Sequence, residues 1–334
     1  MSTAPLESIG SPALWIGFSV FVLTALALDF LVFHRKAQEV STRQALAWVG
    51  LWVTVAMISM VALRVRFGSE SSLQFLAGYL LEYALSVDNL FVFLVIFAYF
   101  AVPPTAKDRV LFLGILGSIA LRGLFIIVGS ALVHRFHWLL YLFGAFLVFT
   151  GLKLLFQKGD EEVAVERSPV IRLFRRLVPM VATYRGNKFL VKENSGWQAT
   201  PLMLVVAVIG FTDVIFATDS IPAIFGVTQD PFIIYSSNIF AVLGLRALFF
   251  VLSHMMTKFH LLKFGLALIL SFIGVKMLIA DLYKIGFAAS LGISQPLKIP
   301  IGAALGVVAG LLALSVIGSA LFPAKEESDA SRPS

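Results

Sequence analysis

Residues 73–100 read LQFLAGYLLEYALSVDNLFVFLVIFAYF, an apolar stretch with carboxylates in its middle. Crossing the roughly 30 Å hydrocarbon core of a bilayer takes about 20 apolar residues in a helix, so this stretch is long enough to span a membrane. Glu82 and Asp88 stand well inside it, and Asn89 follows them. An ionisable side chain at that depth is costly, which marks it as functional. The stretch therefore predicts a membrane helix that contributes to a polar site.

The composition of the whole chain agrees with this interpretation. Of the 334 residues, 59% are hydrophobic and 13% are charged, and the mean hydropathy is +0.93, which excludes an ordinary soluble domain. Cysteine is absent, which excludes a disulfide framework and a thiolate metal site. We predict an all-α polytopic membrane protein with about nine transmembrane helices, at residues 13–33, 44–63, 72–101, 110–132, 138–156, 200–226, 237–255, 264–282 and 299–321.

A second stretch repeats the first. Residues 201–226 read PLMLVVAVIGFTDVIFATDSIPAIFG, in which Asp213 and Asp219 follow Glu82 and Asp88 at the same distance of 131 positions. The echo continues along the chain. It pairs LRGLF (121–125) with LRALF (245–249), and then GLK (151–153) with GVK (274–276).

Each echoing unit contains three predicted helices, one with acids, one with an arginine and one ending in Gly-x-Lys. Three is odd, so the second unit enters the membrane from the opposite side, which predicts a 3+3 inverted repeat of residues 72–156 and 200–282. Transporters built this way bind their substrate near the midplane, where matching helices meet. The helices at 13–33, 44–63 and 299–321 stand outside the repeat.

Basic residues predict the orientation. Eight Lys and Arg residues lie between positions 157 and 198, so by the positive-inside rule we expect this loop to be cytoplasmic. Counting helices then puts the amino terminus outside and the polar tail 323–334, which we expect to be disordered, inside. In such a protein the net charge of +7 reports orientation and does not indicate a nucleic-acid partner.

The polar groups of the acidic helices favour a hard cation. Carboxylate, amide and hydroxyl oxygens without thiolate or imidazole suit Mn²⁺, Mg²⁺ or Ca²⁺. Pro222 has no N–H group to donate to the carbonyl of Thr218. We therefore expect the helix to unwind there and to leave this carbonyl free beside Asp219. The candidate metal ligands are Glu82, Asp88, Asn89, Asp213, Asp219 and Ser220, and candidates for the ion path are Asp29, Ser86 and Thr218.

Arg122 and Arg246 need anionic partners at membrane depth. Either they are structural counter-ions, or they compete with the cation for the same carboxylates and so balance or gate the site. The alternative for Asp29 is a local pair with His34 or Arg35. Lys153 and Lys276 read as helix-end residues that reach toward the membrane surface.

The acids do not predict an enzyme. An intramembrane aspartyl protease needs two aspartates that share a proton, and the chain has Gly-Phe-Thr-Asp at 210–213 in place of Gly-x-Gly-Asp. No Gly-x4-Gly-Lys-Ser/Thr motif is present, so transport would use an ion gradient or the membrane potential.

The quoted motifs resemble the TerC family of integral membrane proteins, in particular its Alx-like members. The resemblance rests on EYALSVDNLFVF (82–93), FHR (33–35), the LRGLF and LRALF pair, and FATDSIPAIFGVTQDPFIIYSSNIFAVLGLR (216–246), and it covers about residues 14–321. It implies a nine-helix, multi-pass protein of the bacterial inner membrane, related to LysE-type exporters. It also implies links to Mn²⁺ efflux, to tellurite resistance, and to metallation of secreted enzymes beside the secretion machinery.

We therefore expect a Mn²⁺ exporter with a periplasmic amino terminus, a cytoplasmic carboxyl terminus and no tightly bound cofactor. The alternative is a non-transporting membrane scaffold or metallation factor that associates with the secretion machinery. The expected partners of the protein are a divalent cation and the lipid bilayer.

Overall fold

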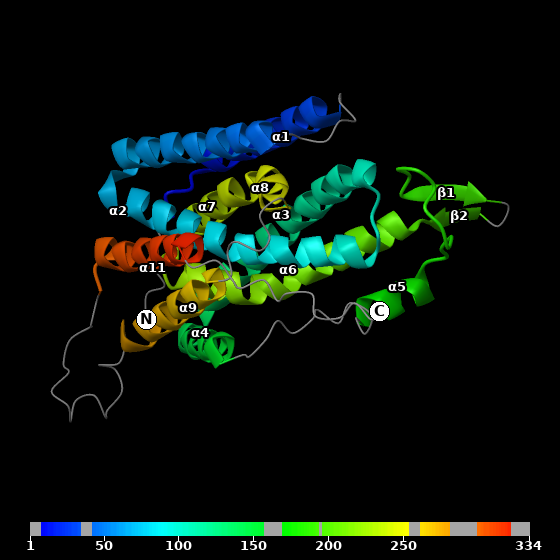
Figure 1. Ribbon diagram of the computed structural model, residues 1–334. Coiled ribbons are helices and arrows are strands. Elements are labelled where there is room, and N and C mark those ends of the chain that lie inside the picture. Colours follow the sequence, from blue (N-terminus) through cyan, green and yellow to red (C-terminus); the bar gives the residue numbers. More distant parts are fainter. Residues whose placement is uncertain are drawn as a thin grey trace.

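The computed structural model describes residues 8–34, 42–156, 169–193, 196–253, 261–280 and 299–321, and it is a bundle of long helices (Figure 1). Eight helical stretches of this described part are long and apolar enough to cross a membrane. The helices are α1 (Pro12–His34), α2 (Thr42–Tyr99), α3 (Pro104–Arg135), α4 (Leu139–Phe156), α6 (Pro201–Phe225), α7 (Pro231–Leu243), α8 (Leu245–Ser253), α9 (Leu262–Ala280) and α11 (Ile301–Leu321). The prediction of an all-α polytopic membrane protein is confirmed.

Two predicted helices are joined in α2. The predicted segments 44–63 and 72–101 both lie in Thr42–Tyr99, and the chain turns between them at Gly68, whose φ is 91°. A positive φ costs glycine little because it has no Cβ, so the second segment can fold back without a loop. Counted as two arms, α2 brings the described spans to the predicted number.

The predicted segment 237–255 starts earlier in the structure. Asp230 caps α7 by accepting hydrogen bonds from the backbone N–H groups of Phe232 and Ile233, and Pro231 occupies the first turn. This capping extends the helix by six residues beyond the apolar run. The pair α7–α8, nearly continuous across Gly244, is the most buried of the described spans, with 94% of an 18-residue stretch buried inside the bundle.

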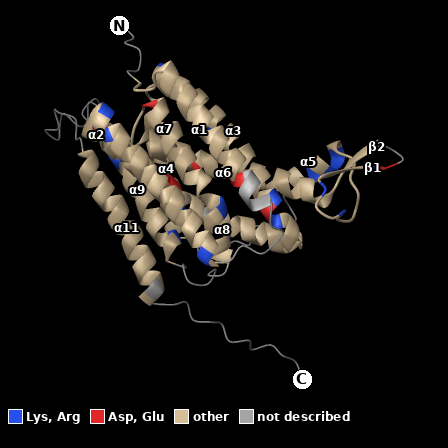
Figure 2. Cartoon of the chain, turned by 90° about the horizontal axis from the view of Figure 1, so that it is seen from above, with Lys and Arg blue, Asp and Glu red and all other residues tan. Residues whose placement is uncertain are grey.

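Around this central span the helices pack in crossed pairs. The second arm of α2 packs against α7 and α8, α6 packs against α3, and α4 packs against α9, while α11 covers α9 and α2. Outward-facing side chains such as Ile127, Phe149 and Leu314 are about two-thirds exposed, as expected of a surface that faces lipid. Figure 2 shows the bundle almost entirely without charge, with the basic segments gathered at helix ends and around α5 and the strands.

Small residues let α4 and α9 approach closely at two places. A Cβ on Gly274 would lie 2.6 Å from the carbonyl oxygen of Gly144, and a Cβ on Gly151 would lie 2.6 Å from the carbonyl oxygen of Ala267. In the echoing sequences, Gly144 corresponds to Ala267 and Gly151 corresponds to Gly274. Exchanging the two repeats therefore turns the first of these contacts into the second. This exchange is what an inverted repeat predicts, although the repeat itself stays a prediction.

The predicted loop 157–198 is folded over much of its length. It contains helix α5 (Pro169–Leu177) and an antiparallel hairpin of β1 (Leu190–Glu193) and β2 (Gly196–Ala199), in which Leu190 pairs with Ala199. This order was not predicted, because each element is short and becomes stable only against the bundle. Residues 157–168 and the predicted tail 323–334 lie outside the described residues.

The two ends of the bundle agree with the helix count. Ser8 and Ile9, before α1, donate hydrogen bonds to Asp230 at the start of α7. At the opposite end, Tyr184 donates to the carbonyl of Phe100. Among the described residues, the predicted outer segments before α1 and before α7 therefore share one end, and the predicted inner residues Phe100 and Tyr184 share the other.

Candidate cation site

Two acids from the matched helices meet at one arginine. Glu82 of α2 and Asp213 of α6 both pair with the guanidinium of Arg122 on α3. Asp213 receives two hydrogen bonds from it, from Nη2 at 3.0 Å and from Nε at 3.2 Å. All three side chains are at most 3% exposed. The structure thus brings together three of the predicted residues in the interior of the bundle, and we call this group the Arg122 cluster.

Neighbouring polar side chains complete the Arg122 cluster. Ser86 donates to Glu82 Oε1 at 3.2 Å, as its position one turn along the same helix face allows. Ser118 donates to Asp213 Oδ2 at 2.7 Å and lies one turn before Arg122. Asn238 of α7 donates from Nδ2 to Glu82 Oε2 at 2.9 Å. Every carboxylate oxygen of the cluster therefore accepts at least one hydrogen bond.

Ser118 and Asn238 were not among the predicted site residues. Both are small polar residues in largely apolar helices, where serine and asparagine more often serve helix packing. One signal was available for Ser118, since it precedes Arg122 by four positions and shares its helix face. Nothing in the local sequence pointed Asn238 at Glu82.

Two buried oxygen atoms near this site lack a partner. Among the described residues, Asn238 Oδ1 and Ser220 Oγ are enclosed and make no hydrogen bond. Gly78 of α2 lies beside Ile224 of α6, and the two helices run in opposite directions. Moving one turn forward from Gly78 along α2 therefore reaches the same level as moving one turn back from Ile224 along α6. We therefore infer that Ser220 lies at the level of Glu82, and Asn89, which is also buried, at the level of Asp213.

Of the two other predicted acids, Asp219 does not join the Arg122 cluster. Asp219 is half-buried, accepts a 3.4 Å hydrogen bond from Thr150 of α4, and lies near enough to Lys153 to interact with it electrostatically. The side chain of Asp88 lies outside the described residues. A single site that holds four acids is therefore not what the described structure contains.

The expected unwinding at Pro222 is absent. Helix α6 continues from Pro201 to Phe225, and the hydroxyl of Thr218, on an exposed face, donates to the carbonyl of Ile215 at 2.6 Å. Pro222 stands only one turn from the end of the helix, where few hydrogen bonds remain to be lost. The prediction that the helix unwinds at Pro222 was wrong for this conformation, whereas the role of Thr218 in the ion path stays a prediction.

Arg246 lies in a second cluster with different partners. It pairs with Asp29 of α1 and with Asp108 at the start of α3, and its guanidinium carbon lies 5.8 Å from the centre of the Phe112 ring. The side chain of Asp108 is 24% exposed, so this Arg246 cluster (Asp29, Asp108 and Arg246) is closer to water than the Arg122 cluster. Asp29 thus has a distant partner, while the side chains of His34 and Arg35, its predicted local partners, lie outside the described residues. Asp108 was missed because it reads as an ordinary helix-start residue.

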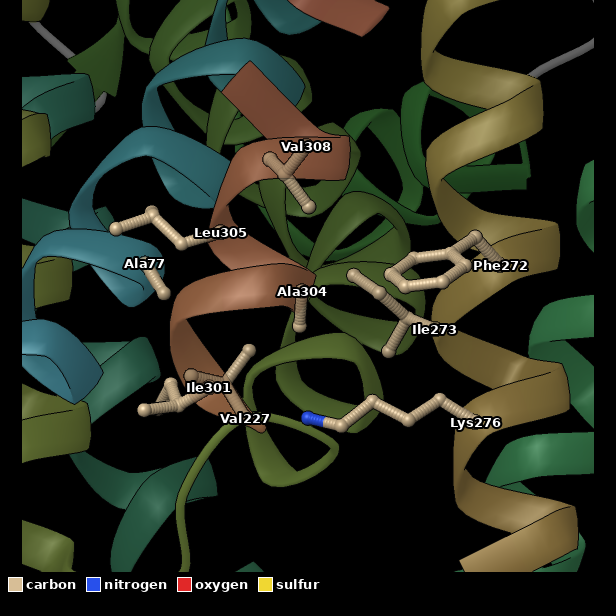
Figure 3. Close-up of a pocket in the computed structure, with 9 residues that line it drawn as sticks. All are labelled: Ala77, Val227, Phe272, Ile273, Lys276, Ile301, Ala304, Leu305 and Val308. Carbon is tan, nitrogen blue, oxygen red and sulfur yellow. The ribbon is translucent and has the colours of Figure 1, made fainter. Parts of the chain in front are cut away.

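Lys276 has a partner at the end of a neighbouring helix, and its reach toward the membrane surface stays a prediction. Its ammonium group donates to the carbonyl of Gly226 at 3.1 Å, just after the end of α6. Figure 3 shows the side chain extending from α9 toward Val227, beside Ile301 and Ala304 of α11. A cation there complements the partial negative charge of a helix carboxyl end.

A metal site is not preformed in the described part of the chain. No group of three or more His, Asp or Glu side chains converges there in a way that could hold an ion. At the Arg122 cluster the reason is visible, since the guanidinium occupies the space between the two carboxylates. Any cation would have to replace it.

Known proteins similar to this chain include a family and several curated relatives. The profile of the family described as "Integral membrane protein TerC family" matches residues 67–327. The chain is 46% identical over 319 residues to "Uncharacterized membrane protein STKORF319" of Myxococcus xanthus, covering 96% of this chain and 95% of that protein. It is 48% identical over 297 residues to "Putative membrane-bound redox modulator Alx" of Salmonella typhi, covering 86% and 92%. No solved structure matches the chain.

Proposed function

Because this chain belongs to the TerC family of integral membrane proteins, we propose that it is a transporter that exports a hard divalent cation, Mn²⁺, through the Arg122 cluster. The observation that carries the proposal is the meeting of Glu82 and Asp213, one from each echoing stretch, at a single buried guanidinium. Ionisable groups so deep in a membrane bundle are costly and usually serve transport.

The charge of the Arg122 cluster favours binding of a cation. With both acids ionised, two negative charges face one positive charge, so the group carries a formal charge of −1 in an enclosed, weakly polar interior. A divalent ion that displaces the guanidinium would meet both carboxylates. Arg122 would then act as the competitor that neutralises the acids while the site is empty.

The oxygen atoms around the acids suit a hard ion. Asn238 Oδ1 and Ser220 Oγ are buried without hydrogen-bond partners, and Ser86 and Ser118 add hydroxyl oxygens. Mn²⁺, Mg²⁺ and Ca²⁺ all prefer such ligands, and no cysteine is available for softer metals. The choice of Mn²⁺ rests on the family resemblance.

The relative from Salmonella typhi is named as a redox modulator, and this bears on the proposal in one way. The present chain has no cysteine, so its own side chains cannot perform thiol–disulfide exchange. A redox role would therefore act through an ion or partner that the protein moves or holds. Metal transport fits that requirement.

Transport of Mn²⁺ into proteoliposomes tests the proposal. Entrapped calcein, which Mn²⁺ quenches, should report faster entry with the wild-type protein than in protein-free vesicles. Glu82→Gln and Asp213→Asn should each abolish the difference, because losing one charged ligand removes much of the attraction that offsets dehydration of the ion.

The matched control is Glu193→Gln, which removes an exposed carboxylate far from the cluster that pairs with Arg185, and it should transport like wild type. All variants must elute as folded protein in size-exclusion chromatography before their fluxes are compared. Wild-type vesicles no faster than empty ones would refute transport of Mn²⁺ and leave the scaffold or metallation factor as the better explanation.

A further inference from the structure

Residues 169–199 form a folded unit that is fixed at one end of the membrane helices. Tyr184 donates to the carbonyl of Phe100 at the end of α2, at 2.5 Å. Thr105, at the start of α3, and Asn187 exchange two hydrogen bonds of 3.2 and 3.1 Å. Burial raises the pKa of Tyr184, so its hydroxyl remains a donor at neutral pH. Since α2 and α3 leave the hydrocarbon core here, the unit lies at the level of the lipid headgroups.

Helix α5 of this unit has three different faces. Ile171 is buried, and Val170 and Phe174 pack beside it against the core of the bundle. Leu173 and Leu177 share another face and are 57% and 69% exposed. Leucines left uncovered on a short helix outside the bundle need a contact that the described part of the chain does not supply.

The third face of α5 is strongly basic. Arg172, Arg175 and Arg176 are all exposed, and the described part of the unit contains six basic residues and one acidic residue, Glu193. The arginines adjoin the exposed leucines around the helix, because Leu173 and Arg176 are three positions apart. An apolar stripe beside a row of arginines is the pattern of a helix that lies in the membrane interface.

We propose that α5 binds the anionic phospholipid surface of the membrane that the protein spans. Leu173 and Leu177 enter the boundary between headgroups and acyl chains, and Arg172, Arg175 and Arg176 contact lipid phosphates. Basic residues beside an anionic surface are attracted to it, so the three together distinguish anionic from zwitterionic lipid. The inference does not depend on cation transport.

Two measurements on the full chain in nanodiscs test the proposal. The absence of cysteine allows single labels, so an environment-sensitive dye is placed on Leu177→Cys and, as a control, on Thr183→Cys in the exposed turn after α5. In nanodiscs containing phosphatidylglycerol, the dye at position 177 should be quenched by lipids that carry a nitroxide on the acyl chain, and the dye at 183 should not. Equal exposure of both dyes to aqueous quencher would overturn the proposal.

The second measurement concerns the arginines. The wild-type melting temperature should be several degrees higher in phosphatidylglycerol than in phosphatidylcholine nanodiscs. The variant Arg172→Gln/Arg175→Gln/Arg176→Gln should lose most of this difference, whereas Lys192→Gln, an exposed basic residue on β1, should keep it. If the triple variant keeps the full difference, or the wild type shows none, α5 is not the lipid-binding surface.

Discussion

Arg122 and Arg246 stand at matching positions in two segments that read almost alike, and both lie between two carboxylates. The partners of Arg122 are acids of the two echoing stretches, whereas Arg246 pairs with Asp29 of α1, outside the repeat, and with Asp108. The local sequence therefore specifies that each buried arginine needs carboxylate partners, and the packing of the helices decides which carboxylates these are. The Arg122 cluster joins the two halves of the bundle, while the Arg246 cluster ties an added helix to it.

The largest expected difference is between the two arginines themselves. Arg122→Ala leaves Glu82 and Asp213 buried without a counter-ion, and breaking such a pair typically costs about 3–5 kcal/mol. Arg246→Ala should cost less, because Asp108 is partly exposed and water can replace the arginine. The fraction of protein that stays monodisperse after heating in detergent measures both effects. Equal losses would show that the two clusters are energetically equivalent.

The next effect concerns packing, in which the two halves behave alike. Gly274→Ala and Gly151→Ala both force a Cβ against a backbone oxygen of the partner helix, and overpacking of this kind costs about 1–3 kcal/mol. Gly210→Ala is the control, because no atom lies within 4 Å of its added Cβ. Melting temperatures should fall for the first two variants by similar amounts. A loss for only one of them would contradict the mirrored α4–α9 contact.

Asn238 allows the Arg122 cluster to be probed without removing a charge. Asn238→Ala takes away one donor to Glu82, which should cost about 1–3 kcal/mol, and it should also weaken Mn²⁺ binding measured by calorimetry. Ser237→Ala is the matched neighbour, since its hydroxyl bonds only to carbonyls of its own helix. If both variants bind Mn²⁺ like wild type, the Asn238 oxygen is not a ligand.

The smallest effect is expected within the Arg246 cluster. Asp29→Asn should destabilise the protein more than Asp108→Asn, because the Asp29 side chain is 11% exposed and that of Asp108 is 24% exposed. Partly exposed pairs contribute about 1 kcal/mol or less and are screened by salt. Raising the salt concentration should therefore shrink the loss for Asp108→Asn and leave that for Asp29→Asn nearly unchanged. The opposite order would place Asp108, and not Asp29, at the main contact of Arg246.

Much of the architecture could be predicted because the bilayer imposes it. A helix of fixed length is the simplest way to carry backbone polar groups through hydrocarbon, so apolar runs of about 20 residues identify the spans. The bend at Gly68 and the capping by Asp230 shift the predicted boundaries by several residues without changing the set of helices. The order in residues 169–199 was not predictable, since it depends on contacts with the ends of α2 and α3.

The candidate site divides in the same way. The sequence by itself determined that Glu82, Asp213 and Arg122 need compensating partners in the membrane, because charges in an apolar run are too costly to stay unpaired. Only the tertiary structure decided that Asp219 turns to Thr150 on α4, that Asn238 turns to Glu82, and that Arg246 reaches α1. The physical reason is that the cost of burying a charge depends on one residue alone. The partner groups that offset this cost depend on which helix faces meet.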